Sequence, residues 1–270
     1  MIALQDQVCR LIHRITRFDS FSKARDYINA HLEGCTIPIV LSFVNAHAVN
    51  LCYSEPGFIA ALLESDVLLR DGVGVSTLYR ILNIDPGFNF CGTDFIPFLL
   101  RTGGPRRIAL LGTTEPYLGK AADRLRGEGH EIVLMMDGFR KPEDYLDALE
   151  PAAPDVVLLG MGMPKQEFVS AMIRTHYTKP LLVINGGACI DFMGEKVKRA
   201  PLWMRRGSLE WVFRLLQEPR RMYRRYLVGN MLFLARAVCM RGRMIPLFLS
   251  DPKLQVHENS SHRIGWRALD

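Results

Sequence analysis

The sequence lacks the cysteine spacings that small metal-binding and disulfide-linked domains require. Its six cysteines are scattered, and no two of them form a Cys-x-x-Cys pair. This pattern excludes the common zinc-ligand spacings and a compact disulfide framework. It favours reduced, mostly buried thiols and therefore a cytoplasmic protein.

Long apolar runs are also missing. The nearest candidate, residues 226–240, is interrupted by Asn230 and Arg236 and is too short to span a bilayer. The N-terminus carries Gln5, Asp6 and Gln7 where a secretory signal would have an apolar segment. We therefore expect neither a membrane-spanning helix nor a signal peptide.

What is present is an ordinary globular composition with one unusual concentration of charge. The 270 residues are 49% apolar and 23% charged, which fits one large α/β domain or a domain with an appendage. The net charge is +6, and residues 196–225 alone hold ten Lys and Arg against two Glu. Such a local excess suggests a polyanionic partner, namely phosphate, an anionic membrane or nucleic acid.

Short apolar runs alternate with helical periodicity along most of the chain. We expect strands at 39–44, 67–70, 108–111, 132–136, 155–159 and 181–184, with helices over 48–53, 56–65, 75–82, 95–100, 116–126 and up to 175. Further amphipathic helices are expected within 1–34 and after 203. Strands alternating with helices predict an α/β fold with a mostly parallel, doubly wound sheet and flanking helices.

Asp71 stands at the end of the expected strand 67–70 and is followed by Gly72 and Gly74. Ligands of open α/β sheets bind at the carboxyl ends of the strands, where glycines allow close approach. The same pattern also suits a turn former or a helix cap, and on this stretch alone that reading is favoured. His47 is likewise either a base or a structural residue.

Three more turns could meet a ligand. Gly112 and Gly160 each end a strand and precede a helix, a setting that binds phosphate through free amides. Neither turn has the G-x-G-x-x-G or the Walker pattern. Gly92-Thr93-Asp94 is equally a helix cap or a ligand site.

The basic segment continues into a helix with aromatic and aliphatic residues. Arginines stand beside Tyr223, Tyr226 and Phe233 in residues 220–240. This composition suits a helix lying on an anionic membrane surface, and the alternative is a solvated helix that caps the domain. We favour the membrane interpretation because the apolar pattern continues through 245–249.

Several segments together resemble one family, the WecG/TagA/CpsF glycosyltransferases. They occur in the expected order over about residues 39–226: the strand with Asn45-Ala46, Asp71-Gly72-Val73-Gly74, Gly92-Thr93-Asp94, the block 160–167 (Gly-Met-Gly-Met-Pro-Lys-Gln-Glu), 198–201 (Lys-Arg-Ala-Pro) and 209–220. The block 160–167 and the combination of Arg-Ala-Pro with Glu-Trp are the most specific. The resemblance moves Asp71 from turn former to functional residue.

The resemblance implies a fold, a reaction and a location. It implies a Rossmann-like core, here residues 1–205, and a basic helical C-terminal appendage, residues 206–270, that covers the site and meets the membrane. It implies transfer, with inversion, of a sugar from a UDP-sugar to a polyprenyl-diphosphate-linked sugar at the inner face of the cytoplasmic membrane. Asp71 is then the general base.

The remaining site residues follow from the needs of such a transfer. No Asp-x-Asp occurs, so we expect no metal and no cofactor, and the leaving diphosphate must be met by backbone amides and cations. The amides are those of the Gly112 and Gly160 turns, and the cations are Lys165, Arg199, Arg206 and Arg214. Asn45 and Gln166 could hydrogen-bond the sugar or the uracil. The other expected substrate-binding residues are Gly72, Gly74, Gly92, Thr93, Asp94 and Gly162.

Three positions depart from the family pattern. Phe43 replaces a common threonine, Asn89 a common arginine and Glu195 a common glycine. The donated sugar stays open among N-acetylmannosamine, glucose and glucuronic or mannosaminuronic acid. The alternatives are a catalytically altered relative, a nucleotide-dependent oxidoreductase on a similar fold, and a nucleic-acid or membrane binder. We expect no nucleic-acid partner, and the sequence does not decide whether the chain forms a homo-oligomer.

Overall fold

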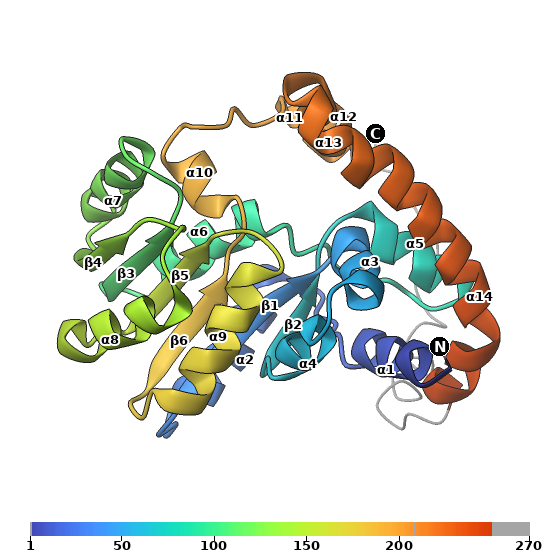
Figure 1. The fold of residues 1–270 in the computed structure, drawn as a ribbon, viewed down its shortest axis with the longest axis horizontal. Coiled ribbons are helices and arrows are strands. Elements are labelled where there is room, and N and C mark those ends of the chain that lie inside the picture. Colours follow the sequence, from blue (N-terminus) through green and yellow to red (C-terminus); the bar gives the residue numbers. More distant parts are fainter. Residues whose placement is uncertain (1, 208, 250–270) are drawn as a thin grey trace, which may run out of the picture.

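The computed structural model describes residues 2–207 and 209–249 and shows a six-stranded, all-parallel sheet covered by helices on both faces (Figure 1). The strands are β1 (Pro38–Val44), β2 (Val67–Arg70), β3 (Arg107–Gly112), β4 (Glu131–Met136), β5 (Val156–Gly160) and β6 (Leu181–Asn185). Their order across the sheet is β2-β1-β6-β5-β3-β4, and every neighbouring pair is parallel. The expected α/β, Rossmann-like fold with flanking helices is confirmed.

Helices follow nearly every strand. They are α1 (Ile2–His13), α2 (Phe21–Leu32), α3 (Ala46–Ser54), α4 (Phe58–Leu63), α5 (Val73–Ile81), α6 (Gly92–Thr102), α7 (Tyr117–Gly127), α8 (Pro142–Ala152), α9 (Lys165–His176) and α10 (Cys189–Met193). The chain then forms α11 (Leu202–Arg206), α12 (Glu210–Gln217), α13 (Pro219–Tyr223), a π-helical turn (Arg224–Val228) and α14 (Gly229–Leu249). The sequence pattern had suggested no helix at α8 or α10.

The core lies on both faces of the sheet because side chains of each central strand alternate between them. One face packs against α2, α6, α7 and α10. The other packs against α1, α3, α4, α5, α8 and α9. Since α3 leaves β1 toward one face and α10 leaves β6 toward the other, a crevice opens between the ends of these neighbouring strands. Such a switch point is the usual ligand position in open α/β sheets.

The helix α14 belongs to the second core. It runs from α13 back to α1 along the outside of α3 and α5 (Figure 1). Phe233, Ala237 and Met240, at helical spacing, are almost completely buried there. Arg236 donates to the Asn50 side chain at 2.7 Å and stacks on Tyr53, with 4.1 Å between its guanidinium carbon and the ring centre. The division at residue 206 stays a prediction, and residues 250–270 of the expected appendage lie outside the described part.

None of the helices in the described part combines the length and the apolar character that crossing a bilayer requires.

Candidate active site

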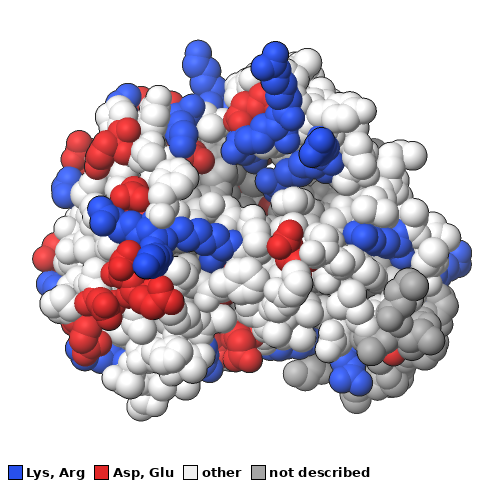
Figure 2. Space-filling view, in the orientation of Figure 1, with Lys and Arg blue, Asp and Glu red and all other residues white. Residues whose placement is uncertain are grey.

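A cavity of about 830 Å³ opens at the carboxyl ends of the strands, at the switch point. The turns after β1, β2, β5 and β6 form its floor, and α12, the π-helical turn and α14 form its roof. In Figure 2 a hollow lies beneath α11–α13, with Lys and Arg side chains gathered around its mouth. Eleven of the residues predicted from the sequence line it: Asn45, Asp71, Gly72, Gly74, Gly92, Thr93, Asp94, Gly160, Gly162, Gln166 and Arg214.

Asp71 lies at the floor of the cavity, half-buried. Its amide donates to the carbonyl of Val44 at 2.9 Å, which fixes the strand end. The Asn45 side chain accepts the amide of Ala48 through Oδ1, at 3.0 Å, and its amide group hydrogen-bonds the Asp71 carboxylate. Burial raises the pKa of Asp71 to about 6, against the opposing effects of the Asn45 hydrogen bond and of the positive charge of Arg225. A carboxylate with that pKa is a competent proton acceptor near neutral pH.

Arg70 and Asn89 fix the Asp71-Gly72 turn through hydrogen bonds. Gly72 has φ +83°, a conformation that other residues rarely adopt, and it precedes α5. The Asn89 side-chain oxygen accepts from the Gly72 amide at 2.8 Å and from Arg70 at 3.2 Å. Arg70 also donates to the carbonyls of Gly72, Pro86 and Gly87. Asn89, which stands where the resembled family commonly has an arginine, therefore contacts the backbone next to Asp71.

The turns after β5 and β6 meet through Gln166. Its side-chain oxygen accepts from the Gly187 amide at 3.0 Å, and its amide donates to Glu167 at 2.8 Å. Burial raises the pKa of Glu167, which has no exposed surface, to about 7. Asn185 also lines the cavity, and its side-chain oxygen has no hydrogen-bond partner in the described part of the chain. Sequence reasoning missed Asn185. The signal that could have found it is its position at the end of a strand, because Asn45 and Asp71 directly follow strands in the same way.

Arginines from the C-terminal helices form the roof. Arg205, Arg214, Arg221 and Arg225 line the cavity. The Nε groups of Arg214 and Arg225 are buried and lack a hydrogen-bond partner among the described residues. Burial lowers the pKa of Arg225, because a desolvated cation is disfavoured. Half-buried cations facing an open space are suited to an anionic ligand. Arg225 and Arg221 were part of the basic run in the sequence but were not singled out.

Three predicted residues, Gly112, Lys165 and Arg199, do not line the cavity, and a fourth, Arg206, has a side chain outside the described part. Gly112 pairs with Gly160, and a Cβ on Gly112 would lie 2.6 Å from the Gly160 backbone, so its position reflects close strand packing. Lys165 donates to the carbonyls of Gly138 and Arg140 at 2.8 and 2.7 Å. Arg199 binds Asp94 through two hydrogen bonds of 2.7 and 3.0 Å. The side chain of Arg206 lies outside the described part.

Phe43 and Glu195, the two other departures from the family pattern, differ in their position relative to the cavity. Phe43 is buried, lines the cavity and packs beside Gly92. Glu195 has φ +60° just after α10 and pairs with Lys120 at 3.6 Å, away from the cavity. A positive φ is a reason for glycine to be common at that position. Among the described residues, no group of three His, Cys, Asp or Glu side chains is placed to hold a metal ion.

An all-parallel sheet with a glycine-lined cavity at its switch point is a feature of Rossmann-like folds, in which ligands bind at this edge of the sheet. The sequence profile of the Glycosyl transferase WecG/TagA/CpsF family matches residues 11–245. The chain belongs to this family, and the resemblance inferred from its motifs is confirmed.

Two curated relatives carry the same name, N-acetylglucosaminyldiphosphoundecaprenol N-acetyl-beta-D-mannosaminyltransferase. The protein from Bacillus spizizenii is 30% identical over 172 residues, which cover 62% of this chain and 66% of that relative. The protein from Bacillus subtilis is 29% identical over 214 residues, which cover 77% of this chain and 83% of that relative. These relatives favour the transferase interpretation over the oxidoreductase alternative.

Proposed function

We propose that the protein is an inverting glycosyltransferase of cell-surface polysaccharide synthesis. It moves a sugar from a UDP-sugar to a sugar linked to polyprenyl diphosphate. The observation that supports this most strongly is the half-buried Asp71 carboxylate on the floor of a cavity roofed by Arg214 and Arg225. The names of the two relatives supply the chemical class of the acceptor.

The proposed chemistry is a single displacement. Asp71 takes the proton of an acceptor hydroxyl, and the hydroxyl oxygen forms a bond to the anomeric carbon of the donor. The bond from that carbon to the diphosphate breaks on the opposite face, which inverts the configuration. The electron pair leaves with UDP, and Arg214 and Arg225 stabilise its new charge. Cations in a desolvated site can do this without a divalent ion, so the proposal is metal-independent.

The decisive experiment offers the purified protein a panel of UDP-sugars together with an N-acetylglucosamine linked through diphosphate to a short prenyl chain. We expect one UDP-sugar to yield a product whose mass exceeds that of the acceptor by one glycosyl residue. NADH and NADPH serve as competing ligands in the same binding assay. No product with any UDP-sugar would contradict the proposal, and tight NADH binding would then support the oxidoreductase alternative.

We expect the pH dependence of kcat/KM to report Asp71. The raised pKa means that the carboxyl is protonated and inactive as a base below about pH 6. Activity should therefore rise about tenfold per pH unit up to that point and then level off. This rise is the acidic limb of the pH profile. His47, whose pKa is lowered to about 4 by burial and Arg225, titrates too low to produce this limb. Glu167→Gln should keep the limb. If the Glu167→Gln variant loses the acidic limb, the limb reports the titration of Glu167 and not that of Asp71.

Peripheral contact with the inner membrane face is part of the proposal. The outer face of α14 presents Met231, Leu234 and Val238, which are 72%, 40% and 63% exposed, at helical spacing. Exposed arginines of α13 and the π-helical turn precede α14 directly in the chain. Apolar side chains flanked by cations favour an anionic lipid surface.

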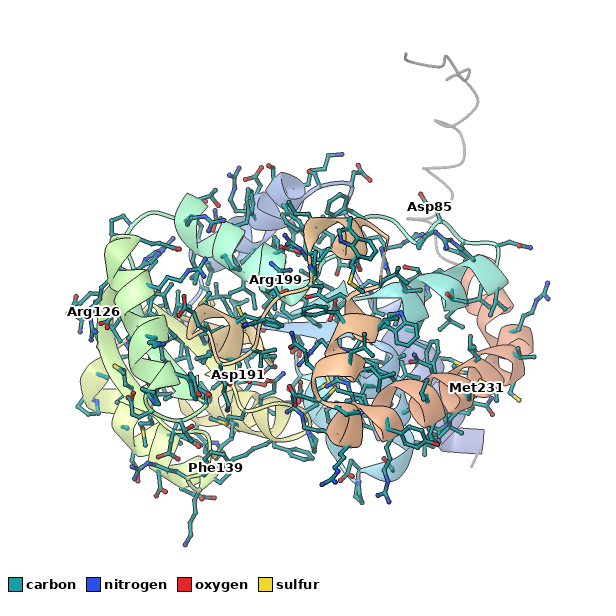
Figure 3. All side chains as sticks on the ribbon, turned by 90° about the horizontal axis from the view of Figure 1, so that it is seen from above. Asp85, Arg126, Phe139, Asp191, Arg199 and Met231 are labelled. Carbon is teal, nitrogen blue, oxygen red and sulfur yellow. The ribbon has the colours of Figure 1, made fainter. Side chains whose placement is uncertain are left out.

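Serine substitutions at Met231 and Val238 together should weaken binding to anionic vesicles by about tenfold or more, because they remove apolar contact area. Phe139→Ser is a matched control, since Phe139 is 78% exposed on a different side of the molecule (Figure 3). Co-sedimentation with phosphatidylglycerol vesicles measures the effect. Equal binding of the double variant and the control would exclude this face of α14 as the membrane contact.

A further inference from the structure

The cavity extends past Asp71 toward the outer edge of the sheet. β2 is an edge strand, and the amide of Phe90 donates to the carbonyl of Arg70 at 3.0 Å. This bond places the loop 86–90 along the open side of β2. The cavity is lined there by the loop and by α5, which starts directly after Asp71. Asp71 therefore separates two halves of the cavity, one at the switch point and one at the sheet edge.

The two halves differ in chemistry. The half at the switch point has the glycine turns after β5 and β6 and the side chain of Asn185. The half at the edge has Val73, Thr77 and Arg80, which share one face of α5 at spacings of four and three residues. Beside them is Phe88, which is 45% exposed although its ring meets Phe21 at 5.2 Å and Phe90 at 5.7 Å between centres.

Arg80 is the cation of the edge half. It is exposed and lines the cavity, and its side chain makes no hydrogen bond or ion pair with the described residues. Arg70 lies close by, but its donors are already bound to the backbone and side chains around Gly72 and Pro86. An arginine and an exposed aromatic ring that line the same cavity match a ligand that carries a diphosphate and an isoprenoid chain together.

We propose that the edge half is the acceptor subsite, in which Arg80 binds the diphosphate of the acceptor and Phe88 and Val73 contact its first isoprene units. This inference rests on the proposed transfer to a polyprenyl-diphosphate-linked sugar. The acceptor sugar then lies at Asp71, and its diphosphate lies two helical turns along α5. Seven residues of helix rise about 10 Å, which is comparable with the length of a hexose and one phosphate.

Inversion supports the same placement. In a single displacement the attacking oxygen and the leaving group lie on opposite sides of the anomeric carbon, so the two substrates must approach from opposite sides. The switch-point half and the edge half lie on opposite sides of Asp71 and meet this demand. The start of α14 packs against α3 and α5 at Gly74, where an added Cβ would lie 2.7 Å from Ala46 and 3.6 Å from the ring of Phe233.

Arg80→Ala tests the diphosphate contact. We expect the KM for a farnesyl-diphosphate-linked N-acetylglucosamine to rise about 10- to 100-fold, because a charge-assisted hydrogen bond is lost. The KM for the donor and the Kd for UDP should not change. Arg80→Lys should recover part of the loss. Arg126→Ala, which removes an exposed arginine on α7 at the far side of the molecule, is the matched control (Figure 3).

Phe88→Ala tests the lipid contact with two acceptors, one carrying a farnesyl chain and one carrying only a methyl group on the diphosphate. We expect the KM for the farnesyl acceptor to rise about tenfold and that for the methyl acceptor to stay near the wild-type value. Phe88→Leu keeps apolar area and should lie between the two. An equal rise for both acceptors would show a loosened loop and would overturn the lipid contact.

The failure of this inference is distinct from the failure of the proposed function. Wild-type transfer to the farnesyl acceptor establishes the function first, before any variant is measured. An unchanged acceptor KM in Arg80→Ala, or a rise in donor KM instead, would then overturn the acceptor subsite and leave the transferase standing. No wild-type transfer with any UDP-sugar would overturn both.

Discussion

We expect the replacement of Asp71 with Asn to lower kcat by about 1,000-fold or more, because an amide cannot accept the proton of the acceptor hydroxyl. The substitution keeps the shape of the side chain and its place beside Asn45, so the Kd for UDP changes little. Transfer assays and calorimetric titration with UDP measure the two quantities. Asp123→Asn, an exposed carboxylate on α7, is the control. Near-normal turnover of Asp71→Asn would remove Asp71 as the base.

The melting temperature of Asp71→Asn shows whether the variant has lost only its general base or has also lost its fold. The raised pKa of Asp71 means that folding favours the protonated carboxyl, so the folded state binds more protons than the unfolded chain between about pH 4 and pH 6. This carboxyl therefore reduces stability as the pH rises through that window. Asp71→Asn should melt at a higher temperature than the wild type above pH 6 and at a similar temperature below pH 4. Lower melting at pH 8 would mean that the variant is inactive through damage.

The strands were predictable because each is a short apolar run in a parallel sheet that has helices on both faces. The expected 39–44 and 181–184 differ from Pro38–Val44 and Leu181–Asn185 by one residue at one end. The helix expected at 75–82 begins at Val73 instead, because Gly72 makes the turn at once. The helix α8 was missed although Pro142 and Asp144 form a typical helix start.

The site was predictable where a polar or glycine residue directly follows a strand, because parallel topology brings all such ends to one edge of the sheet. Asn45, Asp71 and Gly160 line one cavity for that reason. Residues whose position depends on long-range packing were not predictable. Lys165 precedes Gln166 in the same motif, yet it binds carbonyls of the 137–141 loop. No pattern in the sequence indicates which arginines of 205–225 point toward the cavity.

Arg225 shows how a local backbone feature selects one arginine from that run. Residues 224–228 form a π-helical turn, which changes the helical register between α13 and α14. Arg225 is directed into the cavity, where it affects the pKa values of both Asp71 and His47, whereas Arg224 is exposed and does not line the cavity. Two adjacent arginines in one turn thus differ in environment and provide a matched pair of variants.

Arg225→Gln should lower kcat by about 100- to 1,000-fold, because a cation facing the leaving diphosphate in a desolvated site is lost. Arg224→Gln should stay within about twofold of the wild type in kcat, since an exposed charge acts through screened solvent. The removal of Arg225 also removes a charge that lowers the pKa of Asp71, so the acidic limb of kcat/KM should move to higher pH. Arg225→Lys should restore the limb to its wild-type position and recover part of kcat. Equal losses in the two glutamine variants would show that the basic run acts only through its overall charge, and the assignment of Arg225 to the leaving group would then be wrong.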